Sequence, residues 1–228
     1  MSITPGKLGE ILKPYLINKI TGDSVAKTIP VVLVERLLDF LGLVMIALFS
    51  LFFVKYSSYT LAVVGVLLIL VILLPGNKKF SEFMFSLLGR ISPLRKHMEK
   101  IRESHDSIQK MVSPKPLSIM ILISIVSWFF ECFSLYLVLE VFNPQITVMW
   151  SSFIYAFSTV AGALSFFPGG LGITEGSLTF LISDAGFSTD IAILATFIIR
   201  VATLWFAIFI GAISLFLLQK RIGKIKST

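Results

Sequence analysis

Long hydrophobic runs separated by short polar stretches dominate the sequence. Four of the runs reach the ~20 residues that a helix needs to cross a ~30 Å hydrocarbon layer. They occupy residues 31–54, 117–142, 146–167 and 189–218. A fifth run, residues 59–74, would extend only roughly 24 Å as a helix, so it could cross where the bilayer is locally thin. The pattern predicts an all-α, polytopic membrane protein.

A shorter apolar segment, residues 173–186, directly follows Pro168, Gly169 and Gly170. It is too short for an ordinary membrane span. Irregular backbone at membrane depth is tolerated where it is buried in protein or lines a cavity. We therefore interpret the segment as half of a broken helix or as a re-entrant hairpin. Residues 8–20 resemble it in length and position.

Two motifs in the sequence are nearly alike. Pro5-Gly6-Lys7-Leu8-Gly9 is followed by Glu10, and Pro168-Gly169-Gly170-Leu171-Gly172 is followed three residues later by Glu175. The offset from the proline to a downstream arginine is 31 residues for Arg36 and 32 residues for Arg200. Paired Pro/Gly interruptions at matching positions of two halves indicate an internal repeat with a substrate site, as in transporter-like folds.

The composition and charge agree with a bilayer environment. The chain is 56% hydrophobic and 14% charged, whereas soluble domains carry about a quarter charged residues. Most of the net charge of +7 comes from nine Lys/Arg in the connection of residues 75–116 and four in the tail of residues 219–228. Both regions are expected to face the cytoplasm, which places the C-terminus there. Anionic lipid headgroups are the expected partner of this basic surface, and nucleic acid is not.

Within the connection, apolar residues from Phe80 to Ile91 recur at helical spacing on a basic background. This spacing predicts an amphipathic helix on the membrane surface, with a solvated charged loop as the alternative. If the connection and tail lie inside, the helices that bear Arg36 and Arg200 run in opposite directions. We therefore expect an inverted repeat within one membrane domain of residues 1–228. Repeat 1 would span about residues 1–74 and repeat 2 about residues 117–218.

Seven ionisable residues fall within the apolar segments or their breaks. They are Glu10, Glu35, Arg36, Asp39, Glu131, Glu175 and Arg200. A charge at the centre of a membrane helix costs ~2.5 to 3.5 kcal/mol even on the lenient insertion scale, so we expect these side chains to face the interior.

Arg200 lies deep in its helix and has two interpretations. It could form an ion pair with Glu131 or Glu175, or it could bind phosphate in a wet cavity, since its planar guanidinium presents parallel donors. Arg36 gains importance if it mirrors Arg200, and it can pair locally with Asp39 at i,i+3. The alternative is that Glu35, Arg36 and Asp39 are interfacial residues suited to membrane insertion. Glu131 has no basic neighbour on its own span and needs a partner from another helix.

The glycines of the second motif permit backbone conformations barred to other residues and let a helix start expose N–H groups. An anion-cradling loop is one interpretation of this pattern, and a simple helix break is the other. The loop residues would be Pro168, Gly169, Gly170 and Gly172, with Pro5, Gly6 and Gly9 in the partial copy.

No catalytic cluster, metal or cofactor is expected. Both histidines, His97 and His105, lie in the connection, and Cys132 is the single cysteine. Cys132 lies among aromatic residues and is expected to be a small buried hydrophobe. The sequence has no nucleotide-binding loop, so ATP hydrolysis by this chain is not expected.

Taken in order, these pieces resemble the transmembrane, flippase-like domain of the lysylphosphatidylglycerol synthase family, which includes proteins formerly described as dolichol-phosphate-glucose synthetases. The matching pieces are residues 5–10 with Tyr15, residues 34–39, Trp128 with Glu131, and residues 168–172 with Glu175. The resemblance implies a polytopic helical domain that holds a phospholipid or isoprenoid-phosphate headgroup and helps to move it between leaflets. Members usually have further spans ahead of the first motif. We therefore expect a truncated start, or a partner subunit or second copy that completes the first half.

The leading hypothesis is a lipid transporter-like protein of a prokaryotic plasma membrane. Arg36 and Arg200 would bind the phosphate of an anionic lipid, and the five carboxylates would balance and position them. One alternative is an integral-membrane transferase of lipid-linked sugar or aminoacyl-lipid synthesis, although lysyl transfer by this chain alone is not expected. Another is a non-transporting subunit of a membrane complex.

Overall fold

The computed structural model describes residues 14, 16–18, 22, 25–53, 114–143, 145–165 and 167–225. Every regular element in these ranges is helical. The elements are α2 (Val25–Leu51), α8 (Pro114–Glu140), α9 (Val148–Leu164), the 3₁₀ helix η2 (Pro168–Gly170), α10 (Ile173–Asp184), α11 (Thr189–Arg200), the π-helical turn η3 (Val201–Trp205) and α12 (Phe206–Ile225). The predicted all-α fold class is confirmed for this part of the chain.

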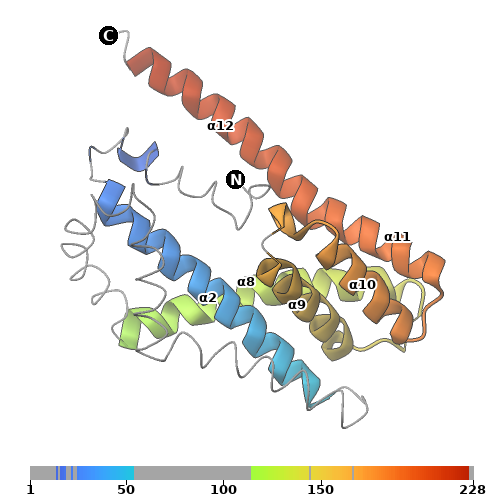
Figure 1. The fold of residues 1–228 in the computed structure, drawn as a ribbon. Coiled ribbons are helices and arrows are strands. Elements are labelled where there is room, and N and C mark those ends of the chain that lie inside the picture. The colour runs from blue at the N-terminus through green and yellow to red at the C-terminus, as the bar shows by residue number, and fades with distance from the viewer. Residues whose placement is uncertain are drawn as a thin grey trace.

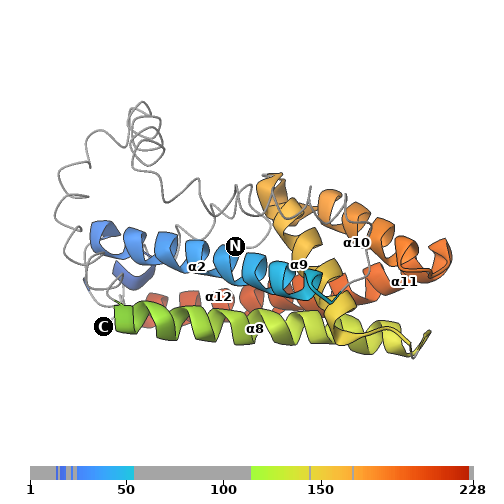
Figure 2. The same cartoon turned by 90° about the horizontal axis from the view of Figure 1, so that it is seen from below.

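Helix α9 lies at the centre of the bundle. It packs against α2, α8 and α10, while α10 packs against α11 and α11 in turn reaches α8 (Figure 1). In both views, α2 and the α11–α12 helix run in opposite directions (Figures 1 and 2). The packing brings one face of α2, α8, α9, α10 and α11 toward a common interior.

Four apolar runs form helices, with boundaries that differ from the predicted ones. Helix α2 begins at Val25, six residues before the run that starts at Val31. Helix α9 is shorter than its run, because the Thr147 side chain accepts a hydrogen bond from the Trp150 N–H and caps its start. Its end at Leu164 comes just before the proline of the second motif.

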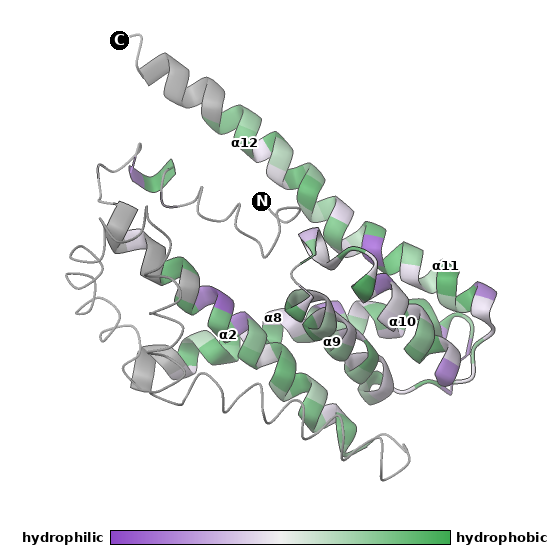
Figure 3. Cartoon of the chain, viewed as in Figure 1, coloured by the Kyte–Doolittle hydropathy of each residue, from purple (hydrophilic) through white to green (hydrophobic). Residues whose placement is uncertain are grey.

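Two of the described helices are long and apolar enough to cross a membrane. They are Ser118–Glu140 and Thr189–Leu218, of 23 and 30 residues, while Val148–Leu164 is a shorter apolar helix. Large hydrophobic side chains such as Phe130, Phe209 and Phe216 are exposed on these helices. Figure 3 shows hydrophobic residues along α8, α11 and α12 and hydrophilic positions in the middle of α2. Exposed apolar surface of this extent is typical of an interaction site or a lipid-facing wall.

The run of residues 189–218 forms the first part of one continuous helix from Thr189 to Ile225, which takes in part of the predicted basic tail. The π-helical turn Val201–Trp205 interrupts its regular hydrogen bonding directly after Arg200. Single π-helical turns inside α-helices are frequent at functional sites. The sequence pattern gave no sign of this turn.

Several predictions concern residues outside the described ranges. These include the first motif with Pro5, Gly6, Gly9 and Glu10, the run of residues 59–74 and most of the connection of residues 75–116. Of the segment 8–20, only Pro14 and residues 16–18 are described, and they are helical.

A continuous hydrophobic core joins α2, α8, α9, α10 and α11. Val44, Leu135, Ile154, Leu178 and Ile199 have no exposed surface and come from these five helices in turn. Cys132 is also fully buried in this cluster, as expected of a small hydrophobe. The core fixes the helices around the polar interior described next.

Candidate functional site

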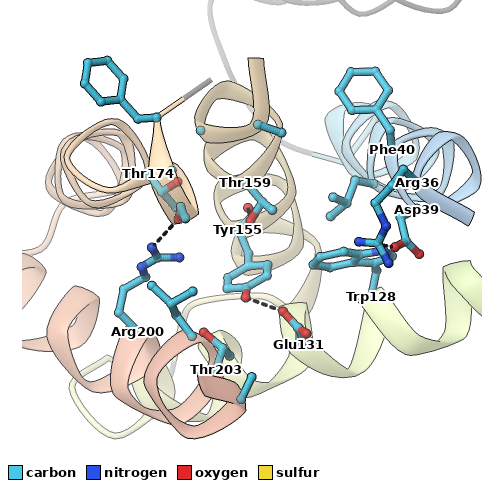
Figure 4. Close-up of a pocket in the computed structure, with 18 residues that line it drawn as sticks. Arg36, Asp39, Phe40, Trp128, Glu131, Tyr155, Thr159, Thr174, Arg200 and Thr203 are labelled. Atoms are coloured by element: carbon cyan, nitrogen blue, oxygen red, sulfur yellow. Dashed lines mark hydrogen bonds and ion pairs between the residues drawn. The ribbon is translucent and has the colours of Figure 1, made fainter. Parts of the chain in front are cut away.

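A cavity of about 360 Å³ lies where α2, α8, α9, the η2 break and the α11–α12 helix meet. Its polar lining includes Arg36, Asp39, Trp128, Glu131, Tyr155 and Arg200. Figure 4 shows Arg36 and Arg200 on opposite sides, with Tyr155 and Glu131 between them. Volumes of 300–1,000 Å³ are usual for ligand pockets. The structure thus brings both predicted phosphate-binding arginines to one cavity.

The Arg200 side chain connects the long helix to the break that precedes α10. Its Nε donates to Glu175 Oε1 at 2.5 Å, and one of its terminal nitrogens donates to the Gly169 carbonyl at 2.9 Å. The other Glu175 oxygen accepts a hydrogen bond from the Gly172 N–H at 2.6 Å. The Arg200 side chain is 11% exposed. Of the two ion-pair partners left open by the sequence, the structure selects Glu175.

The break in helical structure between α9 and α10, at residues 168–172, depends on glycine. Gly169, Gly170 and Gly172 have φ angles of 64°, 67° and 84°, in the left-handed region that other residues avoid. A Cβ on Gly170 would lie 2.6 Å from Thr174 Oγ1, and a Cβ on Gly162 of α9 would collide with the same oxygen. The glycines therefore allow α9, the break and α10 to approach closely.

The backbone N–H groups of the break are largely used within the chain. Gly170 donates to the Phe167 carbonyl at 2.9 Å and Leu171 donates to the Pro168 carbonyl at 3.2 Å. The Gly172 N–H is bonded to Glu175 as described. In this conformation the break therefore acts mainly through the position it gives Arg200, rather than through these three N–H groups.

Arg36 on α2 forms ion pairs with two carboxylates of the same helix. It lies 3.0 Å from Glu35 Oε1 and 3.0 Å from Asp39 Oδ2, so the expected i,i+3 pairing is present. The Ser124 hydroxyl of α8 donates toward Asp39 Oδ1 at 3.3 Å and the Leu38 carbonyl at 3.2 Å. The carboxylates and Ser124 thus fix the direction of the Arg36 guanidinium at the wall of the cavity.

Glu131 on α8 accepts a hydrogen bond from the Tyr155 hydroxyl of α9 at 2.5 Å. This bond supplies the expected partner from another helix. Tyr155 is 4% exposed, so its aromatic ring is almost entirely within the bundle. Thr203 of the π-helical turn lies next to the Tyr155 hydroxyl (Figure 4). The pair forms the wall between the two arginines.

The charges of the site do not add up to a positive pocket. The two arginines and the two carboxylates that line the cavity balance to zero when all are ionised. Glu35 and Glu175, which bond to the arginines, add an excess of two negative charges. Each arginine therefore already has a compensating carboxylate, and an incoming anion adds negative charge to a site that is not positive.

The sequence reasoning missed three polar lining residues, Tyr155, Thr159 and Thr203. Tyr155, Thr159 and Gly162 follow one another at spacings of four and three residues, which places them on one face of α9. This face of polar and small residues on a short apolar helix was the signal that could have indicated Tyr155 and Thr159. Thr203 carried no such signal, because its position depends on the π-helical turn.

Metal ligation finds no support in the described part of the chain. Among those residues, no group of three or more His, Cys, Asp or Glu side chains could hold a metal ion.

Comparison with known proteins identifies the family. The chain is 24% identical to a UPF0104 membrane protein of Methanocaldococcus jannaschii, over 98% of this chain and 95% of that protein. It is 21% identical to a UPF0104 membrane protein of Methanothermobacter thermautotrophicus, over 86% of this chain and 65% of that protein. For one from Pyrococcus horikoshii, the identity is 23%, over 93% of this chain and 71% of that protein. No solved structure matches. The family described as the lysylphosphatidylglycerol synthase TM region matches residues 1–211, and the protein belongs to this membrane-protein family.

Proposed function

We propose that the protein binds the phosphate-bearing headgroup of an anionic phospholipid or an isoprenoid phosphate in this cavity and moves it between the leaflets of the membrane. The observation that carries the proposal is the placement of Arg36 and Arg200 on two sides of one cavity at the meeting point of the helices. Intramembrane charges are expensive, and their collection around an open space is typical of a substrate site.

Arg200 has donors left for a ligand. A guanidinium carries five N–H groups. Within the described residues, two of them bond to Glu175 and the Gly169 carbonyl. The remaining three suit the oxygens of a phosphate, because the planar guanidinium can offer two parallel bonds. The bonds to Glu175 and Gly169 hold the side chain in one orientation and so lower the entropy lost when a headgroup binds.

The helix directions support an inverted-repeat architecture for transport. The helices that bear Arg36 and Arg200 run in opposite directions (Figures 1 and 2). In this proposal, repeat 1 covers about residues 1–74 and repeat 2 about residues 117–218, with α10 as a re-entrant segment. The chain crosses the plasma membrane several times, its C-terminus is cytoplasmic, and a second copy or partner subunit completes the first half.

The proposal is tested by reconstitution into liposomes that contain a fluorescent phosphatidylglycerol or a fluorescent polyprenyl phosphate. A membrane-impermeant quencher measures how fast the probe exchanges between leaflets. We expect Arg36→Ala and Arg200→Ala to slow the exchange strongly, while Asp190→Asn leaves it unchanged. Asp190 is an exposed residue on α11, outside the cavity, and serves as the control.

Three results would count against lipid transport. Exchange at the wild-type rate in both arginine variants would show that the cavity arginines are not needed for transport. Incorporation of a sugar or an aminoacyl group into the lipid would show a transferase instead. Absence of exchange, together with a protein that co-purifies in stoichiometric amount, would indicate a non-transporting subunit.

A further inference from the structure

The charge balance of the cavity poses a problem for any anionic ligand. Six ionisable side chains, Glu35, Arg36, Asp39, Glu131, Glu175 and Arg200, form or adjoin its wall, and they carry an excess of two negative charges when all are ionised. A phosphate brings at least one more negative charge to this cavity. Like charges at short range in such a site disfavour the ionised form of a carboxyl group. Binding therefore becomes easier if one carboxylate takes up a proton.

Position singles out Glu131 among the carboxylates. It lies between Arg36 and Arg200 on the cavity wall (Figure 4). Asp39 and Glu175 are each held in an ion pair with an arginine. Glu131 is nine residues from the end of α8 at Glu140, well inside the candidate span Ser118–Glu140.

Each element around Glu131 presents a charged or titratable group to it or near it. Helix α2 presents Arg36 and Asp39, and α9 presents Tyr155. Helix α11 presents Arg200, which is ion-paired with Glu175 of α10. On its own helix, Cys132 is the next residue. The Tyr155 hydroxyl donates to Glu131 Oε2. A proton on the other carboxylate oxygen, Oε1, would leave that hydrogen bond in place.

We infer that Glu131 takes up one proton from water when a phosphate headgroup enters the cavity and releases it when the headgroup leaves, so that lipid and proton move together. The inference rests on the proposed function and adds an energy source to it. No covalent bond of the lipid changes. The proton reaches the carboxylate as the phosphate approaches, and the excess negative charge of the loaded cavity does not increase.

The direct test measures protons taken up on lipid binding. The purified protein in detergent micelles, in a weakly buffered solution with a pH-sensitive dye, receives a short-chain phosphatidylglycerol. By linkage, the wild type should take up about one proton per bound lipid, and Glu131→Gln should take up about none. In this variant, the amide oxygen of the introduced glutamine can still accept the hydrogen bond from Tyr155. The matched control is Glu140→Gln, because Glu140 accepts a hydrogen bond from Tyr136 at 2.8 Å on the same helix but outside the cavity.

The second test is transport across a pH gradient. In liposomes with fluorescent phosphatidylglycerol, an imposed gradient should accelerate exchange by the wild type and by Glu140→Gln. The Glu131→Gln variant should exchange lipid at a rate that the gradient does not change. In micelles, the affinity of the wild type for the lipid should depend on pH wherever Glu131 is ionised in the lipid-free protein and protonated in the lipid-bound protein. In that range the affinity should fall up to about tenfold per pH unit as the pH rises.

The outcomes separate the inference from the proposed function. Lipid binding and exchange without proton uptake would overturn proton coupling and leave lipid transport standing. Equal proton uptake by Glu131→Gln and the wild type would overturn the assignment to Glu131. If the wild type binds and exchanges neither phosphatidylglycerol nor a polyprenyl phosphate, both fail together. Should Glu131→Gln not fold, the proton count of the wild type still decides, because a count near zero overturns the coupling.

Discussion

Replacement of Arg200 by methionine tests whether its ion pair shapes the break between α9 and α10. Met is close to Arg in length and apolar, so the change removes the charge while it keeps much of the packing. Two hydrogen bonds disappear, to Glu175 Oε1 and to the Gly169 carbonyl. Bonds from a charged donor contribute ~1.5–3 kcal/mol each. Glu175 is 30% exposed and retains the Gly172 N–H, so solvent recovers part of the loss. We expect a destabilisation of about 2–4 kcal/mol.

The measurement is equilibrium unfolding in mixed micelles, with increasing fractions of a denaturing detergent and tryptophan fluorescence as the signal. A double-mutant cycle with Glu175→Gln isolates the pair from other effects of each change. Residues in one ion pair should show a coupling energy of at least about 1 kcal/mol, with the double variant more stable than the sum of the single losses predicts.

Arg200→Lys separates the structural role from binding. Lysine keeps the positive charge but lacks the planar set of donors, so it can restore only part of the arrangement. We expect intermediate stability and weak lipid binding. If the effects of Arg200→Met and Glu175→Gln add to within about 0.5 kcal/mol, the two side chains do not act as a pair, and the account of the break is wrong.

Three further predictions concern packing around the site. Gly162→Ala should destabilise the protein by about 1–3 kcal/mol because its Cβ collides with Thr174 Oγ1. Thr174→Ala should recover part of this loss, and Gly211→Ala, which has open space, should be neutral or slightly stabilising in the same unfolding assay. Ser124→Ala should cost about 0.5–1.5 kcal/mol through the lost α2–α8 hydrogen bonds, and an unchanged midpoint would contradict this. Cys132 should react with a maleimide only after unfolding, and rapid labelling of the folded protein would disprove its burial.

The apolar runs alone predicted which parts of the described chain are helical. The runs of residues 117–142 and 189–218 are long, so their helices are evident from hydrophobicity, and the coarse fold follows. The boundaries were less accurate because they depend on single side chains such as the Thr147 cap of α9. Hydrophobicity also cannot show that Thr189–Ile225 contains a π-helical turn, since that turn changes hydrogen bonding without changing composition.

The site was partly predictable for a different reason. A charge within an apolar run needs a partner, so Arg36, Glu131 and Arg200 were evident as candidates. The choice between Glu131 and Glu175 as the partner of Arg200 required the three-dimensional arrangement. Tyr155 was missed because a tyrosine in an apolar helix is not conspicuous in a sequence, although its hydroxyl bonds to Glu131.

The ion pair between Arg200 and Glu175 also has a consequence for how the chain enters the membrane during synthesis. Glu175 is made 25 residues before Arg200 and belongs to α10, which packs against α11. An isolated arginine in the apolar stretch Thr189–Leu218 would add about 2.5–3.5 kcal/mol to the cost of insertion. When the two helices insert together as a hairpin, the negative charge is already present and the arginine enters as half of a neutral unit. We therefore expect insertion of the long helix to depend on a glutamate in the helix made before it.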